Sequence, residues 1–540
     1  MHIRLFQKLN GNLTLLLFIL FSLLIVILRN TEVLNDDVVL ELCYSGYFSG
    51  GVPVSDHLFQ HFFLTKVISF LYTYFNYLNW YFYLHLFFLG LSFFTILNVL
   101  KDSKNKYYIL ILVFILFFLE YIYFTFTRIS FYVTFSGFLF FLKYDKLDRY
   151  QLIYSFLMVF LGSIIRPESG FLALILFSLL FINDQNFKKK IADKSILKQL
   201  ILVTVIPLMI LVTHHISNIE NSKRFLVSNL NLTESNLYRF SSFDNEIFDI
   251  FDYARLKNFY FDERFTSEEV VNHVKEKYQK INFKARLKIS IDNVTVFLSN
   301  KIYKLIFIVL MLQILLVNGR YNKIKLFSIS IFFILFFIGL NLFMDLPLIK
   351  DRVFQPLFFS LIISFFVKDL AYESRMNKFI GLLILIIFSY VFISSIWKDG
   401  YIEQSASLKK ELDKVYDRIP SDEMIFDPSL FSLETGLPGN SKVGESENFK
   451  THQILPMGWA QRSYSSKVLY SKMGVQRMDD LLVLPNVSVI LYTEDLNLWN
   501  NYGEKYLSRN LVLYDSICIN NRQSCYYLAR YISNFKIKEK

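Results

Sequence analysis

The chain has 540 residues, of which 54% are hydrophobic, 18% aromatic and only 19% charged, and its formal net charge is +11. This composition is too apolar for a soluble protein of that length. The positive charge sits in short clusters between apolar blocks, which is typical of membrane topology determinants and argues against nucleic acid as a partner. The apolar blocks recur from Leu13 to Trp397, so the sequence predicts a polytopic α-helical membrane protein.

The first apolar block, residues 12–28, lacks a small-residue cleavage site, so we expect a retained span and not a removed signal peptide. Lysine and arginine concentrate in cytoplasmic loops, which orients the chain with its N-terminus inside. Residues 56–80 mix polar and aromatic side chains, which favours a helix lying at the membrane interface. Further spans are expected near 80–100, 107–123, 128–142, 151–165, 169–182, 199–216, 301–317, 326–344, 353–367 and 379–397. This makes about 11 spans of roughly 20 apolar residues or fewer, with residues 399–540 outside.

With this topology, several charged residues gather on the outward side of the membrane. They are Asp36, Asp37 and Glu41 after the first span, Glu120 and Arg128, Arg166 and Glu168 in the turn "RPES", and Asp345, Lys350, Asp351 and Arg352. Ionisable groups at membrane depth are costly and usually have a partner or a function. A site with acids and cations suits a substrate with a phosphate leaving group. Arginine and lysine would hold the phosphate, and a carboxylate would accept a proton from an attacking hydroxyl.

The order of these features resembles a known family. One span, an outward acidic pair, an interfacial helix, a second span and a late stretch "DRVFQPLFF" follow one another. This is similar to the polyprenyl-phosphate-sugar-dependent glycosyltransferases of the GT-C superfamily, the bacterial relatives of protein mannosyltransferases and lipid A aminoarabinose transferases. The match covers about residues 10–400. The family's frequent Pro-Pro before the interfacial helix is absent, and Ser55, Asp56 and His57 stand there.

The resemblance implies roles for the outward residues. Asp36 and Asp37 would be catalytic, Asp36 as general base and Asp37 orienting it or the substrate, although the pair could also bind a divalent cation or belong to a solvated loop. Arg166, Lys350 and Arg352 would bind the donor phosphate. For these the alternatives are a local salt bridge between Arg166 and Glu168, and charged anchors beside a span.

Supporting positions around this site are Glu120, Arg128, Glu168 and His57. Glu120 is expected to partner Arg128 or Arg166. His57 and His61 lie four residues apart, a spacing that can bind metal on a helix, but no third ligand is evident and aromatic packing is the preferred interpretation. A divalent cation is therefore the one cofactor left open.

Two segments are expected to be soluble. We divide the chain into a transmembrane domain, residues 1–398, and an extracytoplasmic α/β domain, residues 399–540. The first includes an outward loop with the interfacial helix (30–79) and a second outward loop (217–300). In the α/β domain, strands are expected at "EMIFDP", "NVSVILY" and "LVLYDSICI", and a helix at "LNLWNNYGEKYLSRN". Cys518 and Cys525 bracket a turn-rich stretch, which favours a disulfide in an oxidising compartment.

The leading interpretation is a glycosyltransferase in a bacterial inner membrane. A polyprenyl-phosphate sugar would be the donor, and a glycan, lipid or protein hydroxyl the acceptor. The alternative is a polysaccharide polymerase or lipid-linked oligosaccharide flippase, although such proteins rarely carry a large outward C-terminal domain. A non-catalytic scaffold is a third class, but it does not explain why charges converge on one side of the membrane.

Overall fold

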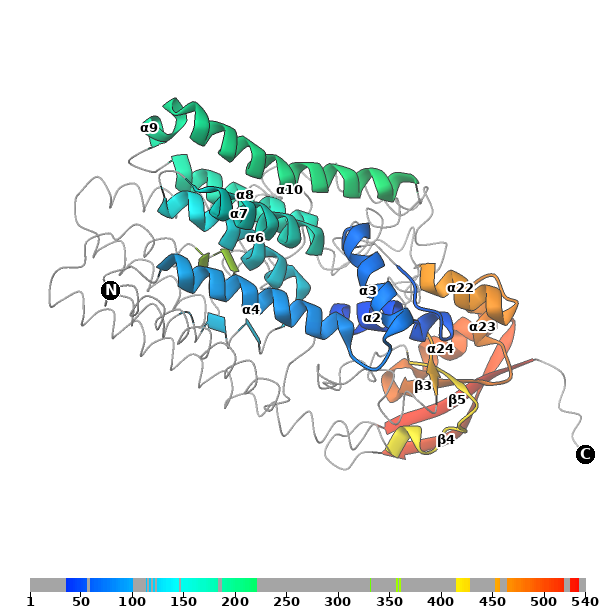
Figure 1. Cartoon of the computed structure of the whole chain (residues 1–540). Helices are drawn as coiled ribbons and strands as arrows, with labels where there is room; N and C mark the ends of the chain where they lie inside the picture. Colours follow the sequence, from blue (N-terminus) through cyan, green and yellow to red (C-terminus); the bar gives the residue numbers. More distant parts are fainter. Residues whose placement is uncertain are drawn as a thin grey trace, which may run out of the picture.

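A computed structural model of the protein shows a bundle of long helices with a small α/β domain at one end (Figure 1). Helices α2 and α3 lie between the two parts. The structure describes residues 35–55, 59–100, 113, 116–117, 120–121, 124–144, 147–182, 187–220, 331, 356–357, 359–360, 414–427, 452–456, 464–518 and 525–533. The predicted spans 12–28, 301–317, 326–344 and 379–397 lie outside these residues, apart from residue 331, and only isolated residues of 107–123 and 353–367 are described. Of the predicted loop 217–300, residues 217–220 are helical and the rest lies outside the described residues.

The helices of the bundle follow the predicted apolar blocks closely. They are α4 (Trp80–Leu100), α6 (Phe126–Lys143), α7 (Arg149–Ile165), α8 (Pro167–Ile182) and α10 (Lys194–Glu220). The short helix α9 (Phe187–Ala192) lies in the basic stretch between two of these blocks. Asp148 and Gln151 form a capping box that starts α7, and proline at the first position of α8 is suited to a helix start. The predicted tight turn "RPES" is confirmed, because α7 ends at Ile165 and α8 begins at Pro167.

Helix length separates the bundle into two kinds of helix. In the described part of the chain, α4 and α10 are the two helices that are long and apolar enough to cross a membrane. Helices α7 and α8 have 17 and 16 residues, which at a rise of about 1.5 Å per residue gives about 25 Å. This is less than the roughly 30 Å hydrocarbon core of a typical bilayer, in line with the short middle spans expected from the sequence.

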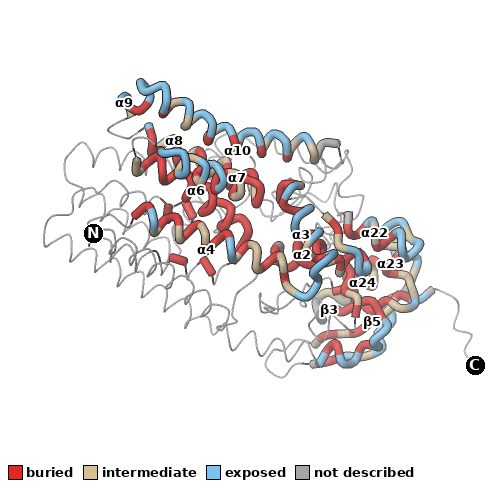
Figure 2. Tube along the Cα trace, viewed as in Figure 1, coloured by how far each residue is buried: buried red, intermediate tan, exposed pale blue. Residues whose placement is uncertain are grey.

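Helices α6 and α7 pack closely because small residues line their contact. A Cβ atom added at Gly162 would lie 2.2 Å from Thr134 Oγ1, and one at Gly137 would lie 2.8 Å from the carbonyl oxygen of Ser155. Ser130 Oγ donates a hydrogen bond to the carbonyl of Gly162 (2.8 Å). Small side chains that let backbones approach, with hydroxyls bonding across helices, are typical of membrane helix packing. Figure 2 shows α6 buried along its whole length.

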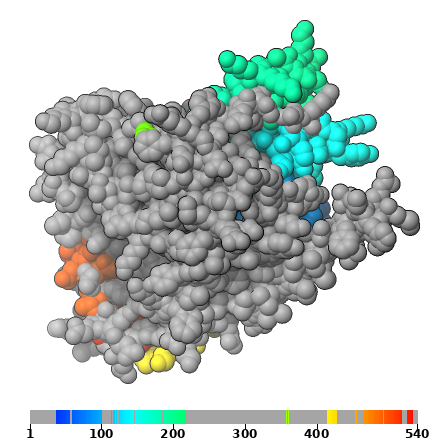
Figure 3. Space-filling view, turned by 90° about the vertical axis from the view of Figure 1, so that its left-hand side faces the viewer, coloured from blue at the N-terminus to red at the C-terminus, as the bar shows by residue number. Residues whose placement is uncertain are grey.

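Helix α10 is more exposed than α6. Its outer face exposes large apolar side chains at helical spacing, visible as the exposed stretches of α10 in Figure 2. These residues are Ile201, Leu202, Val205, Leu208, Met209, Val212 and Ile216. In the space-filling view, the surface of α10 and the surface of the C-terminal domain lie at opposite edges of the molecule (Figure 3). An apolar face of this kind on a long helix is suited to contact with lipid.

The segment after the first predicted span is helical, which corrects the expectation of a loop there. Helix α2 (Asn35–Tyr44) is followed by the short 3-10 turn η1 (Tyr47–Ser49). The sequence "NDDVVLELCY" carries the signal, because Asn and Asp at the start of a run with apolar residues three and four apart are typical of a helix N-terminus. The reading of Asp37 as part of a solvated loop is therefore wrong, since this side chain is completely buried.

The interfacial helix is shorter than expected. Helix α3 (Phe62–Tyr74) begins after His61, whose backbone is extended and whose Nδ1 accepts a hydrogen bond from Phe63 N–H. His61 is thus an N-cap, and His57 lies outside the described residues. One face of α3 is buried, and the other exposes a stripe of apolar residues, as an interfacial helix would. The exposed residues are Phe63, Val67, Phe70 and Tyr74.

The C-terminal domain is built on one mixed sheet. Its elements are β1 (Met424–Phe426), β2 (Gln453–Ile454), α22 (Tyr464–Met473), α23 (Met478–Leu482), β3 (Val487–Tyr492), the 3-10 turn η5 (Thr493–Asp495), α24 (Leu496–Tyr502), the π turn η6 (Gly503–Leu507), β4 (Arg509–Cys518) and β5 (Cys525–Ser533). The strand order is β2-β1-β3-β5-β4. Strands β2, β1 and β3 are parallel, whereas β5 pairs antiparallel with both β3 and β4. The predicted strands are present.

The structure corrects the predicted end of one helix in this domain and gives the register of its two cysteines. The helix expected over 496–510 ends at Tyr502, and the chain then passes through η6 to Ser508, which has a positive φ of 51°. Cys518 lies directly opposite Cys525 in the register of the β4–β5 hairpin, and Cys525 is disulfide-bonded.

Helix α2 contributes to two hydrophobic cores. Its residues Leu40 and Tyr44 belong to the core of the helix bundle. Val38, Val39, Leu42 and Cys43 belong to the core of the C-terminal domain, together with residues of β1, β3 and β5. Because these two sets of residues lie on opposite faces of one helix, α2 joins the bundle to the domain (Figure 1).

Candidate functional site

The candidate site is centred on Asp37, which α2 points into the helix bundle. Tyr81 Oη donates a hydrogen bond to Asp37 Oδ1 at 2.7 Å, and the backbone N–H of Phe126 donates to the same oxygen at 3.1 Å. Tyr81 lies at the start of α4, and Phe126 is the first residue of α6. Asp37 therefore links the first turns of two bundle helices.

The start of α6 is an electrostatically favourable position for a carboxylate. The first N–H groups of a helix have no partner within the helix, and its N-terminus carries a partial positive charge. Thr125 Oγ1 accepts from Arg128 N–H at 3.3 Å, and Asp37 accepts from Phe126 N–H. The two side chains thus satisfy two of these donors, and α6 stabilises the negative charge of Asp37.

Tyr81 is held in position by contacts on several sides. Its backbone N–H donates to Tyr72 Oη at 3.2 Å. Its carbonyl accepts from His85 Nδ1 at 2.7 Å, and the rings of Tyr81 and His85 lie 4.4 Å apart. Since a carbonyl can only accept, His85 carries its proton on Nδ1, and its Nε2 accepts from the Gln60 amide at 3.0 Å. The amide oxygen of Gln60 in turn accepts from Tyr44 Oη at 3.1 Å.

A second buried carboxylate, Glu41, lies one turn after Asp37 on α2. Tyr72 Oη lies 3.4 Å from Glu41 Oε1 and donates to Asn79 Oδ1 at 3.1 Å. Asn79 Oδ1 also accepts from Phe82 N–H at 2.9 Å, so Asn79 caps α4. Burial, and then the charge of Glu41, raise the pKa of Tyr72 well above its ordinary value. The phenol therefore stays protonated and able to donate.

Arg166 reaches the same region from the turn between α7 and α8. Its guanidinium lies over the rings of Phe126 and Phe59, with Cζ 5.1 Å and 5.5 Å from the ring centroids. Nη1 donates to Thr127 Oγ1 at 3.3 Å, and Nε lies 3.6 Å from Glu168 Oε2. The Arg166 side chain is 21% exposed, so it is a cation held by aromatic rings that still reaches the surface of the protein.

Asp37 and Arg166 are therefore brought together at one residue. Asp37 binds the backbone N–H of Phe126, and Arg166 packs over the ring of Phe126. The salt bridge between Arg166 and Glu168 that the sequence left as an alternative is also present. It is compatible with a binding role, because the Glu168 side chain is 46% exposed and an exposed ion pair contributes only about 0–1 kcal/mol.

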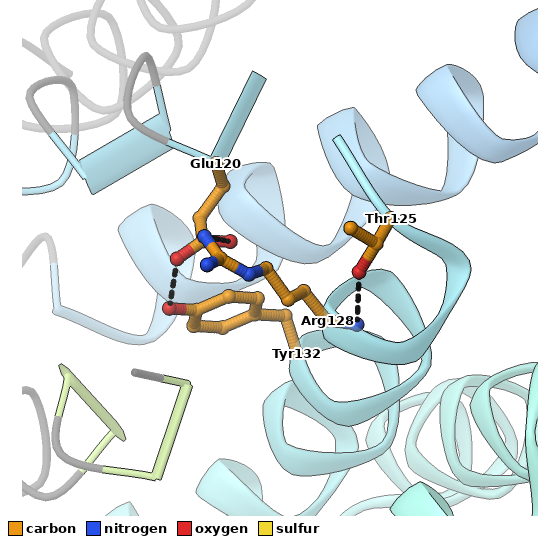
Figure 4. Close-up of polar contacts among 4 residues, drawn as sticks. All are labelled: Glu120, Thr125, Arg128 and Tyr132. Atoms are coloured by element: carbon orange, nitrogen blue, oxygen red, sulfur yellow. Dashed lines mark hydrogen bonds and ion pairs between the residues drawn. The ribbon is translucent and has the colours of Figure 1, made fainter. Parts of the chain in front are cut away.

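Glu120 and Arg128 form a separate buried pair deeper in the bundle. Arg128 Nη1 lies 3.3 Å from Glu120 Oε2, and Tyr132 Oη donates to Glu120 Oε1 at 2.9 Å (Figure 4). Of the two partners expected for Glu120, the structure thus selects Arg128. Removing one member of a buried ion pair costs about 3–5 kcal/mol because the other charge is left behind. The pair therefore anchors the first turns of α6.

The remaining predicted site residues are only partly described. Lys350, Arg352 and His57 lie outside the described residues, and for Asp36 the structure describes the backbone, which is the second residue of α2. His61 Nε2 lies 3.1 Å from Thr213 Oγ1 of α10. Within the described ranges, no group of three His, Cys, Asp or Glu side chains could hold a metal ion. A cation bound by Asp36 and Asp37 stays a prediction.

Sequence reasoning missed Tyr81, Gln60 and His85 as members of this site. His85 had a detectable signal, because a titratable side chain in the middle of an apolar span usually has a partner or a function. Tyr81 had none, since it is one of 34 tyrosines in the chain. Its role depends on the packing of α2 against α4, which only the tertiary structure shows.

Comparison with known proteins identifies no family for this chain. No protein-family model and no curated protein matches its sequence. Among solved structures, the crystal structure of ArnT from Cupriavidus metallidurans in the apo state aligns with 95% of this chain and 97% of that one. The sequence identity is 8% and the TM-score is 0.40. A likeness this distant carries no weight for the assignment of fold family or function.

Proposed function

We propose that this protein is a membrane glycosyltransferase that moves a sugar from a polyprenyl-phosphate donor to an acceptor hydroxyl on the outer face of a bacterial inner membrane. The observation that supports it best is the meeting of Asp37 and Arg166 at Phe126. These residues come from α2 and from the α7–α8 turn. They bring a carboxylate and a partly exposed cation to the start of α6. Transfer of a sugar from a phosphate donor requires this pair of charges.

The basic residues at the other ends of these helices agree with this orientation. Helix α6 starts at the site and ends at Lys143, and α7 starts at Arg149 and returns to Arg166. Lys190 Nζ donates to the carbonyl of Phe141 at 3.1 Å, so a further cation lies at the end of α6. By the positive-inside rule, that end faces the cytoplasm and Asp37 faces outward.

In the proposed reaction, the acceptor oxygen attacks the anomeric carbon of the donor sugar. The bond from that carbon to the phosphate oxygen breaks, and polyprenyl phosphate leaves with the bonding electrons. Asp36 accepts the hydroxyl proton, which typically contributes about 10²–10⁴-fold to rate. Asp37, whose Oδ1 already accepts two hydrogen bonds, orients the reacting groups. One base suffices for transfer with inversion.

Arg166 binds the donor phosphate in this proposal, with Lys350 and Arg352 as further cations. A guanidinium forms short, charge-assisted hydrogen bonds to phosphate oxygens. The Arg166 guanidinium packs over the rings of Phe59 and Phe126. These contacts keep the guanidinium oriented before the donor binds. The polyprenyl tail of the donor would remain in the bilayer.

The test is transfer of a labelled sugar from its polyprenyl phosphate in membranes, with donor binding measured on purified protein. Asp36→Asn should lower turnover by about 10²–10⁴-fold while donor binding is retained. Asp37→Asn keeps an oxygen that can accept from Phe126 N–H, so the fold should survive while turnover falls. Arg166→Ala should weaken donor binding, whereas Glu168→Gln, the matched control, removes only the partner of Arg166 and should leave binding nearly unchanged.

Two outcomes contradict the proposal. Full transfer by both Asp36→Asn and Asp37→Asn would show that the acidic pair has no part in the chemistry. Movement of a lipid-linked oligosaccharide across the membrane without sugar transfer would favour the flippase alternative instead.

A further inference from the structure

The C-terminal domain is attached to the outward loop through Tyr47, the first residue of η1. Tyr47 Oη donates a hydrogen bond to the carbonyl of His452 and accepts one from the backbone N–H of Ile454 at 2.8 Å. The side-chain amide of Gln453 donates to the carbonyl of Tyr47 at 2.7 Å. Residues 453 and 454 form β2, one of the two edge strands of the sheet. A single tyrosine thus pairs with the edge strand much as a further strand would.

The chain around Tyr47 is compact, so this contact is transmitted to α2. Gly46 has a φ of 86°, and a Cβ atom there would lie 2.6 Å from Pro53 N, so only glycine fits this turn. Gly51 N–H donates to the Gly46 carbonyl at 2.8 Å, and Lys472 Nζ of α22 donates to the Gly50 carbonyl at 2.7 Å. Burial raises the pKa of Tyr47 far above its ordinary value. The hydroxyl therefore remains protonated and keeps donating.

Helix α2 is supported on two faces, by the bundle through Leu40 and Tyr44 and by the C-terminal domain. Its domain-facing side chains, Val38, Val39, Leu42 and Cys43, are buried in the core of the C-terminal domain. Asp37, adjacent to Val38, points the other way, to Tyr81 and Phe126. The position of Asp37 relative to α4 and α6 thus depends on a helix whose other face is part of a different domain.

We propose that Tyr47 is a positioning residue: by fixing β2 to η1, it holds the C-terminal domain on α2 and so sets the position of the acidic pair against the start of α6. This inference rests on the glycosyltransferase function proposed above. It gives the C-terminal domain a role in turnover that does not depend on contact with either substrate.

The experiment compares Tyr47→Phe with Tyr514→Phe in the full-length protein. Tyr514 Oη is hydrogen-bonded to Ser488 Oγ at 2.7 Å within the sheet of the same domain, so its loss weakens the domain without touching η1. Cys43 reports docking directly, because its thiol is completely buried between α2 and the domain. Maleimide labelling of Cys43 is followed by mass spectrometry, alongside sugar transfer and donor binding.

Tyr47→Phe leaves the His452 carbonyl and the Ile454 N–H without the hydroxyl that pairs with them. We expect Cys43 to be labelled about tenfold faster or more, because a local opening becomes easier. Turnover should fall by about tenfold to a hundredfold, since a misplacement of about 1 Å has effects of that size, while donor binding is retained. Tyr514→Phe should change neither labelling nor turnover by more than about twofold.

Each other result overturns the inference. Faster labelling with wild-type turnover would mean that docking does not position the site, and unchanged labelling would mean that Tyr47 does not hold the domain. Equal effects of both substitutions would point to general destabilisation. Absence of transfer by the wild-type protein from any polyprenyl-phosphate sugar would instead remove the proposed function itself, and the inference with it.

Discussion

At the scale of single residues, the site is defined by one carboxylate oxygen and its two donors. Asp37 Oδ1 accepts from a side chain of α4 and from the backbone of α6, so its position is determined by two helices at once. The N–H of Phe126 is a backbone group, so any residue except proline at that position would supply it. Tyr81 is the replaceable donor. It therefore offers the sharpest test of how far Asp37 depends on its surroundings.

Tyr81→Phe should lower turnover with little change in donor binding. The substitution removes the phenol oxygen but keeps the ring against His85, and a hydrogen bond to a charged group contributes about 1.5–3 kcal/mol. Sugar transfer in membranes measures the effect. Tyr77→Phe is the control, since Tyr77 is an exposed tyrosine four residues earlier. Equal turnover of wild type and Tyr81→Phe would show that Tyr81 does not orient Asp37 for catalysis.

At the scale of elements, the seam between α6 and α7 determines how the bundle is assembled. Gly137 of α6 and Gly162 of α7 both lie in this seam, and each allows the facing helix to approach. Ser155 Oγ donates to the Gly137 carbonyl at 2.8 Å, and Ser130 Oγ does the same at Gly162. The turn with Arg166 directly follows α7. Separation of this seam would therefore also displace Arg166 from Phe126.

Gly162→Leu should prevent close packing of α6 and α7. Even a Cβ atom would lie 2.2 Å from Thr134 Oγ1 and 2.4 Å from Thr134 N, and overpacking a well-packed core typically costs about 1–3 kcal/mol or more. Thermal unfolding in detergent should show a lower Tm. Leu157→Phe adds bulk on the exposed face of the same helix and should leave Tm within a degree or two. Similar Tm values for both variants would contradict the packing described.

At the scale of the whole molecule, the two ends of the bundle differ in charge. The end with α2, α3 and the C-terminal domain holds Asp37, Glu41 and Arg166, and the other end holds Lys143 and Lys190. This separation agrees with the orientation predicted from the basic loops. Because the C-terminal domain packs on α2, it lies at the same end of the bundle as Asp37.

Reporter fusions ending at Lys190 and at Lys540 should therefore report opposite sides, cytoplasmic for the first and extracytoplasmic for the second. The reason is that Lys190 lies at the basic end of the bundle, whereas the C-terminal domain lies at the end with Asp37. Alkaline phosphatase and green fluorescent protein fusions give complementary signals for the two sides. Two cytoplasmic results would remove the topology on which the outward site depends.

The amino-acid sequence by itself determined where the helices of the bundle lie. Helices α4, α6, α7, α8 and α10 coincide with predicted apolar blocks to within a few residues, because length and hydropathy are local properties that a bilayer requires directly. Strands β1, β3 and β4 of the C-terminal domain were predicted for a similar reason. Their runs of β-branched and aromatic residues are local signals as well.

Only the tertiary structure decided which side chains meet. The sequence singled out the acidic pair and Arg166, but not their meeting at Phe126, nor the role of Tyr81. The sequence also did not predict that residues 35–44 form helix α2, or that this helix contributes to two hydrophobic cores. Contacts between residues such as Asp37 and Phe126, 89 positions apart, depend on how helices pack against one another. Packing depends on shape complementarity along whole helix faces, which no local pattern of residues encodes.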